Sequence, residues 1–376
     1  MERLQRVKLS GFKSIREMDL ELRALNVLIG ANGAGKSNLI SFFKMLNEMM
    51  AGQLQTFIAT SGHAHSFLRF GPKVTSEIRA RLEFSVEVRA ATGAATDVYE
   101  FRLAYAAADQ LVFAEEQLAR EGFLTRTAVG MGSGHAEAQL RTASDWPTTP
   151  NRSEIVHFLE RCRVFHFHDT SATARVRQYG YIDDNRRLRS DAGNLAAFLL
   201  RLREENGAAY RRIVSTVRLI APFFDDFILH PPATGSGNGP DVILNWREKG
   251  SDEVFGPHQL SDGTIRAIGL VTLLLQPEGE LPQFIIVDEP ELGLHPYAID
   301  VVASLFKKAS HHTQVLVSTQ SPTFLDEFDP ADIVVVDRDG RESQFVRPDP
   351  ERLESWLEDY SLGEVWQKNV IGGGPH

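Results

Sequence analysis

The chain has 376 residues, of which 43% are hydrophobic and 24% are charged, and its formal net charge is −10. This composition is typical of a globular protein with a large core, and the acidic balance argues against a surface devoted as a whole to nucleic acid. No apolar run is long enough to cross a bilayer, and the N-terminus lacks the apolar stretch of a signal peptide. A single cysteine, Cys162, indicates packing and a reducing cytoplasm.

The first elements in chain order are two short strands, predicted at Arg3 to Phe12 and Met18 to Leu22. The apolar strand "LNVLIG" (Leu25 to Gly30) then runs into a glycine-rich loop, and a helix follows from Lys36. Alternating polarity from Phe67 to about Phe113 predicts antiparallel strands with one wet face. A short helix in "EIVHFLERC" and the strand "RVFHFH" complete this half of the chain.

The second half alternates helices and apolar strands. A helix is predicted near Asn194 to Leu219, a loop at His230 to Asp241, and a strand in "VILNW". After "HQLSDGT" comes a helix, then the strand "QFIIVDEP", the helix "YAIDVVASLFKKA" and the strand "VLVST". This order predicts one α/β domain with a helical sub-lobe at roughly Asp183 to Gln276. By motif, the chain divides into residues 1–182, 183–276 and 277–376.

The segment "GANGAGKSN" (Gly30 to Asn38) fits the phosphate-loop pattern G-x-x-x-x-G-K-[ST]. The glycines let backbone amides curl around a phosphate, and the helix that starts there points its positive end at the anion. Lys36 would reach the β- and γ-phosphates, and the Ser37 hydroxyl would take a Mg²⁺ position. The strand before the loop and the helix after it are the context that this motif requires. The predicted nucleotide-binding residues are Asn32, Gly33, Ala34, Gly35, Lys36, Ser37 and Asn38.

The segment "FIIVDEPELGLHP" (Phe284 to Pro296) contains two adjacent carboxylates at the end of an apolar strand. A central strand that ends in Asp288 would deliver this carboxylate to the ligand-binding edge of the sheet, where it would hold magnesium. Glu289 would orient or deprotonate the attacking water. A solvated pair in a loop is the alternative, and the apolar strand disfavours it.

The segment "QLSDGTIR" (Gln259 to Arg266) opens a helix, with Ser261 as its cap and Gly263 in its first turn. A plain helix cap explains it locally. Together with the other two motifs in this order, it resembles the signature of ABC-type ATPases, which typically reads LSGGQ. Asp262 and Thr264 replace a glycine and the glutamine. In that superfamily the signature of one subunit closes on the ATP of another, so the resemblance implies a head-to-head homodimer in which Ser261 and Gly263 contact ATP in trans.

Three further features resemble the SMC, RecF and OLD branch of this superfamily: "GFKSI" near the start, Asn38 after the loop serine, and "DEPELGLHP". The implied fold is a P-loop NTPase of ABC/SMC-head type, with a mixed central sheet, an antiparallel β sub-lobe and a helical signature sub-lobe. The implied cofactors are ATP and Mg²⁺. Asp288 and Glu289 carry over as metal and water residues, and Leu292 to His295 as the D-loop. Gln178 is a candidate magnesium ligand of the Q-loop, from its position alone.

Gln320 follows the apolar strand "VLVST", where this superfamily commonly has a switch histidine that contacts the γ-phosphate. A glutamine donates a neutral amide hydrogen bond to that phosphate but cannot carry the charge of an imidazolium. We therefore expect Gln320 to sense the γ-phosphate in a slow ATPase whose ATP-bound dimer persists. The alternative is a residue at a helix start, hydrogen-bonded only to backbone.

Two other clusters have simpler interpretations. "FHFHDTS" offers His166, His168 and Asp169 as metal ligands, but a strand that leads into the next lobe is favoured. "IVVVDRDGRE" resembles the D-x-D of the TOPRIM nuclease part of OLD proteins, with Asp337 and Asp339 as ligands. A hairpin turn explains it more simply.

The sequence thus predicts a cytoplasmic ATPase that hydrolyses ATP to ADP and phosphate, with Lys36, Glu289 and Gln320 as its catalytic residues. Resemblance favours a link to DNA repair or anti-phage defence through a separate effector protein, with no membrane contact. The arginine-rich segment Arg161 to Arg212 is the local hint of nucleic acid. The alternatives are a nucleotide-gated switch that binds only protein, an ABC transporter subunit, and an OLD-like nuclease.

Overall fold

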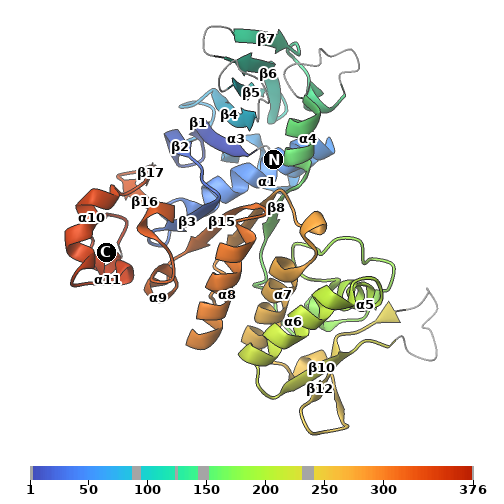
Figure 1. Cartoon of the computed structure of the whole chain (residues 1–376). Coiled ribbons are helices and arrows are strands. Elements are labelled where there is room, and N and C mark those ends of the chain that lie inside the picture. The colour runs from blue at the N-terminus through green and yellow to red at the C-terminus, as the bar shows by residue number, and fades with distance from the viewer. Residues whose placement is uncertain (1–2, 87–94, 123–125, 143–151, 231–240, 375–376) are drawn as a thin grey trace. The chain divides into compact units, whose positions relative to one another are not determined.

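The computed structural model describes residues 3–86, 95–122, 126–142, 152–230 and 241–374 of the chain (Figure 1). These residues form two compact units. The first unit comprises residues 1–163 and 329–376, and the second comprises residues 164–328. The division into 1–182, 183–276 and 277–376 follows motifs and stays a prediction. The single α/β domain expected from the sequence likewise stays a prediction.

The first unit contains a six-stranded antiparallel sheet in the order β2-β1-β4-β5-β6-β7 (Figure 1). Its strands are β1 (Leu4–Phe12), β2 (Ile15–Glu21), β4 (Glu77–Val86), β5 (Ala95–Ala106), β6 (Gln110–Glu121) and β7 (Arg126–Gly130). A row of paired residues crosses the sheet on its buried face, namely Val7, Leu82, Tyr99 and Leu118. The next row carries Lys8, Arg81, Glu100 and Gln117 on the opposite face. This alternation confirms the predicted antiparallel strands with one wet face.

A second group of strands in this unit places the glycine-rich loop. Strand β3 (Leu25–Ile29) is buried along its whole length and pairs in parallel with β16 (Ile333–Asp339). Strand β17 (Glu342–Val346) returns antiparallel beside β16. The helices of the unit are α1 (Lys36–Ala51), α2 (Leu54–Thr60), α3 (His63–Phe67), α4 (Arg152–Glu160), α10 (Pro350–Leu357) and α11 (Leu362–Gln367), with 3₁₀ turns η1 (Gln139–Arg141) and η5 (Pro330–Asp332). The rings of Phe12, Phe42 and Phe67 pack together in its core.

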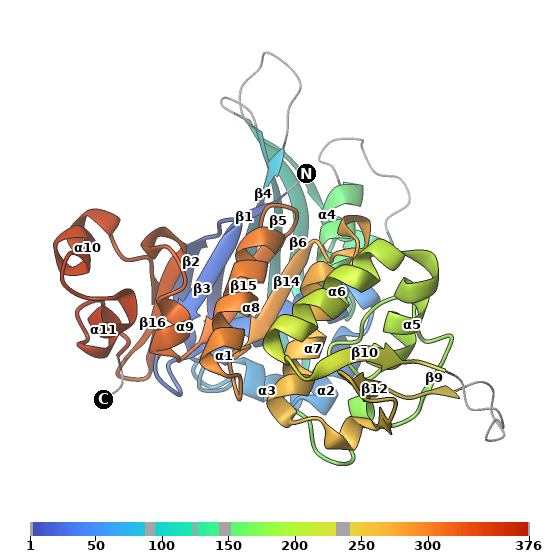
Figure 2. The same ribbon diagram turned by 60° about the horizontal axis from the view of Figure 1, so that its bottom comes forward.

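The second unit is built around two parallel strands, β14 (Phe284–Asp288) and β15 (Gln314–Thr319), with Asp288 opposite Ser318. Figure 2 shows three of its helices, α5, α6 and α7, grouped beside strands β10 and β12. The helices are α5 (Leu195–Glu205), α6 (Gly207–Ile220), α7 (Asp262–Leu275), α8 (Pro296–Ala309) and α9 (Pro322–Leu325), with 3₁₀ turns η2 (Arg175–Arg177), η3 (Pro257–Gln259) and η4 (Glu278–Glu280). The smaller strands are β9 (Gly180–Tyr181), β10 (Phe224–Ile228), β11 (Asp241–Val242), β12 (Asn245–Glu248) and β13 (Val254–Phe255). Strand β8 (Cys162–Phe165) lies at the boundary of the units.

Two predicted elements differ from the structure. The single helix expected from Asn194 to Leu219 is two helices, because Asn206 ends α5 and its side chain accepts a hydrogen bond from the Ala209 amide at the start of α6, at 3.1 Å. The strand "VILNW" is split into β11 and β12. Most of the loop predicted at His230 to Asp241 lies outside the described residues.

Two further expectations concern Cys162 and membrane spans. Cys162 is buried, and this burial raises the pKa of its thiol to about 12, as expected of a packing residue. Among the helices in the described ranges, none has both the length and the apolar character that a bilayer crossing requires.

Candidate functional site

The glycine-rich loop leaves the buried strand β3 and ends at the first turn of α1. Gly33 and Gly35 adopt positive φ angles of 79° and 119°, which glycine reaches without steric cost. The side chain of Lys36 is buried, and its ammonium donates hydrogen bonds to the backbone carbonyls of Gly30 and Ala31. The Ser37 hydroxyl is exposed at the helix start. The backbone therefore has the form of a phosphate-binding turn that leads into a helix N-terminus.

A chain of hydrogen bonds supports this loop from strands that are distant in sequence. The Asn38 amide donates to Ser14 Oγ at 2.6 Å, and Ser14 Oγ shares a hydrogen bond with Ser343 Oγ at 2.6 Å. Ser343 is buried on β17, and its hydroxyl also donates to the carbonyl of Ala34 at 2.6 Å. A Cβ atom on Gly35 would lie 2.1 Å from Ser343 Oγ. Ser343 thus explains why this loop position must be glycine, and the sequence motif did not reveal it.

The C-terminal segment also contacts the loop. The amide of Ala31 donates to the carbonyl of Gly373 at 3.0 Å, and the indole of the buried Trp366 donates to the same carbonyl at 2.9 Å. Gly30 lies against β16, where an added Cβ would be 2.1 Å from the carbonyl oxygen of Val336. The loop is thus contacted on its first residues by β16 and by the segment after α11.

The acidic motif lies at the carboxyl ends of β14 and β15 in the second unit. Asp288 is the last residue of β14, and the amide of Glu289 donates to the carbonyl of Ser318 at 2.8 Å. Glu289 has a positive φ of 44°, a strained conformation that is often found at functional positions. The Gln320 side-chain amide donates to Glu289 Oε1. Gln320 therefore contacts the predicted catalytic carboxylate, and helix α9 is capped by Ser321 instead.

A third carboxylate, Glu291, lies two residues after Glu289 and is 9% exposed. Its Oε1 accepts a hydrogen bond from Thr319 Oγ1 at 2.5 Å. Burial raises the pKa of Glu291 to about 7, with the nearby charge of Glu289 acting in the same direction and the Thr319 hydrogen bond opposing them. The sequence pattern of this segment indicates roles for Asp288 and Glu289 but not for Glu291.

The signature segment forms a capped helix start, as predicted. Ser261 Oγ accepts a hydrogen bond from the Thr264 amide at 3.1 Å, and Gly263 lies in the first turn of α7. A Cβ on Gly263 would lie 2.1 Å from the carbonyl oxygen of Gly293 in the predicted D-loop, so the two segments require glycine at their contact. Asp262, which departs from the family pattern, forms an ion pair with the buried Arg177 at 2.7 Å. Its hydrogen bond with Arg177 lowers the pKa of Asp262.

Arg266 joins the signature helix to two neighbouring segments. Its guanidinium donates to the carbonyl of Leu292 in the D-loop at 3.0 Å and to that of His168 at 2.9 Å. The His168 ring in turn forms a hydrogen bond with the carbonyl of Asp288 at 3.0 Å. His168 is therefore engaged with backbone, and the described ranges contain no group of three or more His, Cys, Asp or Glu side chains arranged for a metal.

Gln178 ends the short turn η2 and is exposed. Its side-chain amide donates to the carbonyl of Ala172 at 2.8 Å. Its role as a magnesium ligand stays a prediction. Asp337 and Asp339 lie on β16, and Asp339 pairs with Glu342 across the tight turn into β17, as the hairpin interpretation requires.

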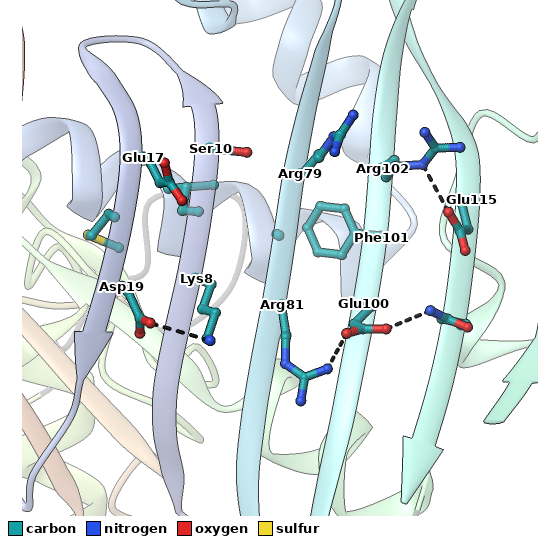
Figure 3. Close-up of a pocket in the computed structure, with 14 residues that line it drawn as sticks. Lys8, Ser10, Glu17, Asp19, Arg79, Arg81, Glu100, Phe101, Arg102 and Glu115 are labelled. Carbon is teal, nitrogen blue, oxygen red and sulfur yellow. Dashed lines mark hydrogen bonds and ion pairs between the residues drawn. The ribbon is translucent and has the colours of Figure 1, made fainter. Parts of the chain in front are cut away.

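The exposed face of the antiparallel sheet contains a hollow of about 340 Å³ that is lined by both acids and bases, several of which form ion pairs with one another (Figure 3). Lys8 contacts Asp19 at 3.3 Å, Arg102 contacts Glu115 at 2.9 Å, and Arg81 contacts Glu100. The described residues that line this hollow include as many acids as bases, so the hollow has no excess positive charge with which to bind a phosphate backbone.

Several arginines between Arg161 and Arg212 are used within the fold. Arg177 donates to three backbone carbonyls, of Thr170, Pro257 and Leu260. Arg201 pairs with Glu280 at 2.5 Å, and Arg189 pairs with Asp184 at 2.6 Å. The hint of nucleic-acid binding drawn from this segment is weakened accordingly.

The predicted site residues therefore gather in two groups. The residues from Asn32 to Asn38 belong to the first unit, whereas Asp288, Glu289, Gln320 and the signature segment belong to the second. Their joint action on one nucleotide stays a prediction.

Comparison with known proteins gives a family and a fold. The family described as "AAA domain, putative AbiEii toxin, Type IV TA system" matches residues 25–121 and 144–326. A comparison with curated proteins found no match.

Among solved structures, an Smc head bound to the C-terminal winged-helix domain of ScpA has a TM-score of 0.61 at 16% identity, covering 93% of this chain and 99% of that chain. An Smc head with an extended coiled coil from Pyrococcus furiosus, bound to the C-terminal domain of ScpA, has a TM-score of 0.60 at 14% identity, covering 96% and 99%. An Smc head with a coiled coil and joint from Pyrococcus yayanosii has a TM-score of 0.56 at 12% identity, covering 96% and 99%. At these identities the likeness shows the fold, which is that of a P-loop NTPase of the SMC-head type.

Proposed function

Because this chain belongs to that AAA domain family, whose ATPases are related in fold to SMC heads, we propose that it binds Mg·ATP and hydrolyses it slowly as a head-to-head dimer. The observation that carries the proposal is the turn from β3 into α1, with Gly35 at a φ of 119° and Lys36 at the helix start. Such a turn presents backbone amides and an ammonium group to phosphate oxygens.

The nucleotide contacts follow from the chemistry of each side chain. The amides from Asn32 to Gly35 and the ammonium of Lys36 would bind phosphate oxygens, and Asn38 would hold the loop through Ser14. The exposed hydroxyl of Ser37 and the carboxylate of Asp288 are the hard oxygen donors that Mg²⁺ prefers, so this donor set fits the ion. Gln178 is the remaining candidate ligand. When bound, Mg²⁺ would neutralise charge on the phosphates.

Slow turnover is proposed from the pair formed by Glu289 and Gln320. Glu289 would orient the attacking water and take its proton, and its carboxylate already accepts a hydrogen bond from Gln320. Gln320 is a neutral donor, so it offers less stabilisation to developing phosphate charge than an imidazolium would. Gln320→Ala is expected to change turnover or ATP-dependent dimerisation. A variant that is unchanged in both would show that Gln320 does not sense the γ-phosphate.

Dimerisation is proposed through the signature helix and the D-loop. Ser261 is exposed at the start of α7, and Leu292 of the D-loop is 45% exposed. Their contact within one chain is fixed by Gly263 and Arg266, so the two segments would present one surface to a partner copy. Ser261 and Gly263 would then contact ATP held by the other subunit.

The cellular role that we favour is a cytoplasmic regulator linked to DNA repair or anti-phage defence, acting through a separate effector protein. A nucleotide-gated switch that binds only protein is the second candidate. This second candidate is favoured by the ion pairs on the sheet face and by arginines, such as Arg201, that form ion pairs within the fold.

Steady-state ATP hydrolysis with and without duplex DNA tests these proposals, with Lys36→Ala as the blank. We expect slow hydrolysis in the wild type and none above background in the variant. Stimulation by DNA that weakens as salt is raised would support the nucleic-acid role, whereas indifference to DNA would support the protein switch. Equal rates in wild type and Lys36→Ala would contradict the ATPase proposal itself.

A further inference from the structure

Glu291 is a buried carboxylic acid with an incomplete set of hydrogen bonds. It is 9% exposed, and its Oε2 has no hydrogen-bond partner among the described residues. Leaving a buried polar atom unpaired costs stability, so a side chain whose only task was to fill this space would be more stable as an apolar residue. This cost points to a task for the carboxyl group.

The other oxygen of Glu291 contacts the end of strand β15. Glu291 Oε1 accepts a hydrogen bond from Thr319 Oγ1 at 2.5 Å, and Thr319 Oγ1 in turn accepts one from the Ser321 amide at 3.0 Å. Thr319 and Ser321 are the immediate neighbours of Gln320. The carboxyl group thus joins the turn after β14 to the loop that carries Gln320.

Each of the two segments that Glu291 joins carries one residue of the proposed catalytic pair. Glu289 begins the turn that holds Glu291, and its backbone is fixed by the hydrogen bond from its amide to the Ser318 carbonyl. Gln320 lies between Thr319 and Ser321 and donates to Glu289 Oε1. Two hydrogen bonds between side chains, Thr319 to Glu291 and Gln320 to Glu289, therefore connect the same two segments side by side.

We propose that Glu291 and Thr319 are positioning residues for ATP hydrolysis, which hold Gln320 against Glu289 so that both present a fixed geometry to the γ-phosphate and the attacking water. This inference rests on the proposed ATPase function. Neither Glu291 nor Thr319 would touch the nucleotide, so ATP binding would not depend on them. The raised pKa of Glu291 agrees with a buried carboxyl group that keeps its proton near neutral pH.

The chain offers a matched control at the opposite end of β15. Thr313 precedes the strand, is 1% exposed, and donates through Oγ1 to the backbone carbonyl of Pro282 at 2.5 Å. Thr319 is 0% exposed and ends the strand. Thr313→Val and Thr319→Val therefore remove the same chemical group, at similar burial, from the two ends of one strand.

The test compares kcat, KM for ATP and thermal stability in these two variants. Thr319→Val is expected to lower kcat about tenfold, which corresponds to about 1.4 kcal/mol of activation free energy, while KM changes little because the nucleotide contacts are kept. Thr313→Val is expected to lose similar stability with kcat unchanged. Thr319→Ser and Glu291→Gln keep the hydroxyl and the acceptor oxygen, respectively, and should restore most of kcat. Equal kcat in Thr313→Val and Thr319→Val would overturn the proposal.

A second readout does not require turnover. Hydrogen exchange of the amides of Ser321, Thr323, Phe324 and Leu325 should be faster in Thr319→Val and Glu291→Ala than in Thr313→Val, since the loop has lost its attachment. Unchanged exchange in all three variants would contradict the proposal even if the wild type hydrolysed no ATP. A wild type no more active than Lys36→Ala would instead contradict the proposed function.

Discussion

At the residue scale, the acidic motif combines two strained or costly features. Glu289 holds a positive φ of 44°, and Glu291 is a buried carboxyl group with one unpaired oxygen. Each lowers the stability of the fold, and both lie within three residues of Asp288. Strained or unsatisfied residues that lower stability at neighbouring positions are typical of functional sites.

The raised pKa of Glu291 gives a stability prediction with a definite sign. Because the folded state holds the proton up to a pH of about 7, whereas the ordinary pKa is 4.5, the folded protein binds more protons between these values. The contribution of Glu291 to stability therefore falls as the pH rises from 4.5 to about 7, by roughly 3 kcal/mol at most. Glu291→Gln, which cannot ionise, should raise the unfolding temperature more at pH 8 than at pH 5.

Thermal denaturation of wild type and Glu291→Gln at these two pH values checks this expectation. A change in unfolding temperature that is equal at both would show that Glu291 ionises in the folded protein as it does in the unfolded chain. Glu204→Gln is a suitable control, because Glu204 is exposed on α5.

At the scale of elements, the segment after α11 contacts the phosphate loop through Gly373. Gly373 has a φ of 64°, and its carbonyl accepts hydrogen bonds from Ala31 and from Trp366. An added Cβ would lie 2.8 Å from a methyl carbon of Val335 and 2.9 Å from the carbonyl oxygen of Val336. We expect Gly373→Ala to displace this segment and so to weaken ATP binding.

Gly340→Ala is the matched control for this effect. Gly340 has a φ of 59° and lies in the turn between β16 and β17, but an added Cβ there would have no neighbour within 4 Å. Both variants carry the backbone cost of about 1 kcal/mol for an alanine at positive φ. Gly373→Ala adds a steric cost of about 1–3 kcal/mol. Equal ATP affinity in the two variants, measured by calorimetry, would show that the segment does not influence the loop.

The sequence predicted well those elements whose pattern lies within a few consecutive residues. The phosphate loop, the cap at Ser261 and the strand that ends in Asp288 each follow from a few consecutive residues. The partners of these motifs come from distant parts of the chain and leave no local signal. Ser343, for example, is separated from Ser14 by 329 positions, and the contact of Gly373 with Ala31 joins the two ends of the sequence.

The departure at Asp262 illustrates the same limit. In the signature pattern Asp262 stands only as a replacement for a glycine, whereas in the structure its partner is the buried Arg177, 85 positions away in the sequence. The ion pair gives Asp262 a place in the fold that the motif alone did not indicate. Similarly, Gln320 was identified from its position after a strand, whereas its hydrogen bond to Glu289 required the structure.

At the scale of the whole molecule, charge and contacts favour a partner other than bare nucleic acid. The formal net charge is −10, the sheet face in Figure 3 has paired charges, and Arg177, Arg189 and Arg201 serve the fold. The proposed ATP-dependent dimer is the feature through which a nucleotide would control such a partner.

Sedimentation velocity of Glu289→Gln with and without Mg·ATP is the sharpest test of this dimer, because the variant should retain ATP without cleaving it. Adding Ser261→Asp keeps the helix cap, since aspartate caps as well as serine, but places a negative charge where the partner's phosphate would lie. We expect a dimer of Glu289→Gln in Mg·ATP, a monomer without nucleotide, and loss of the dimer but not of ATP binding in the double variant. A Glu289→Gln protein that binds ATP and stays monomeric would contradict the proposed dimerisation.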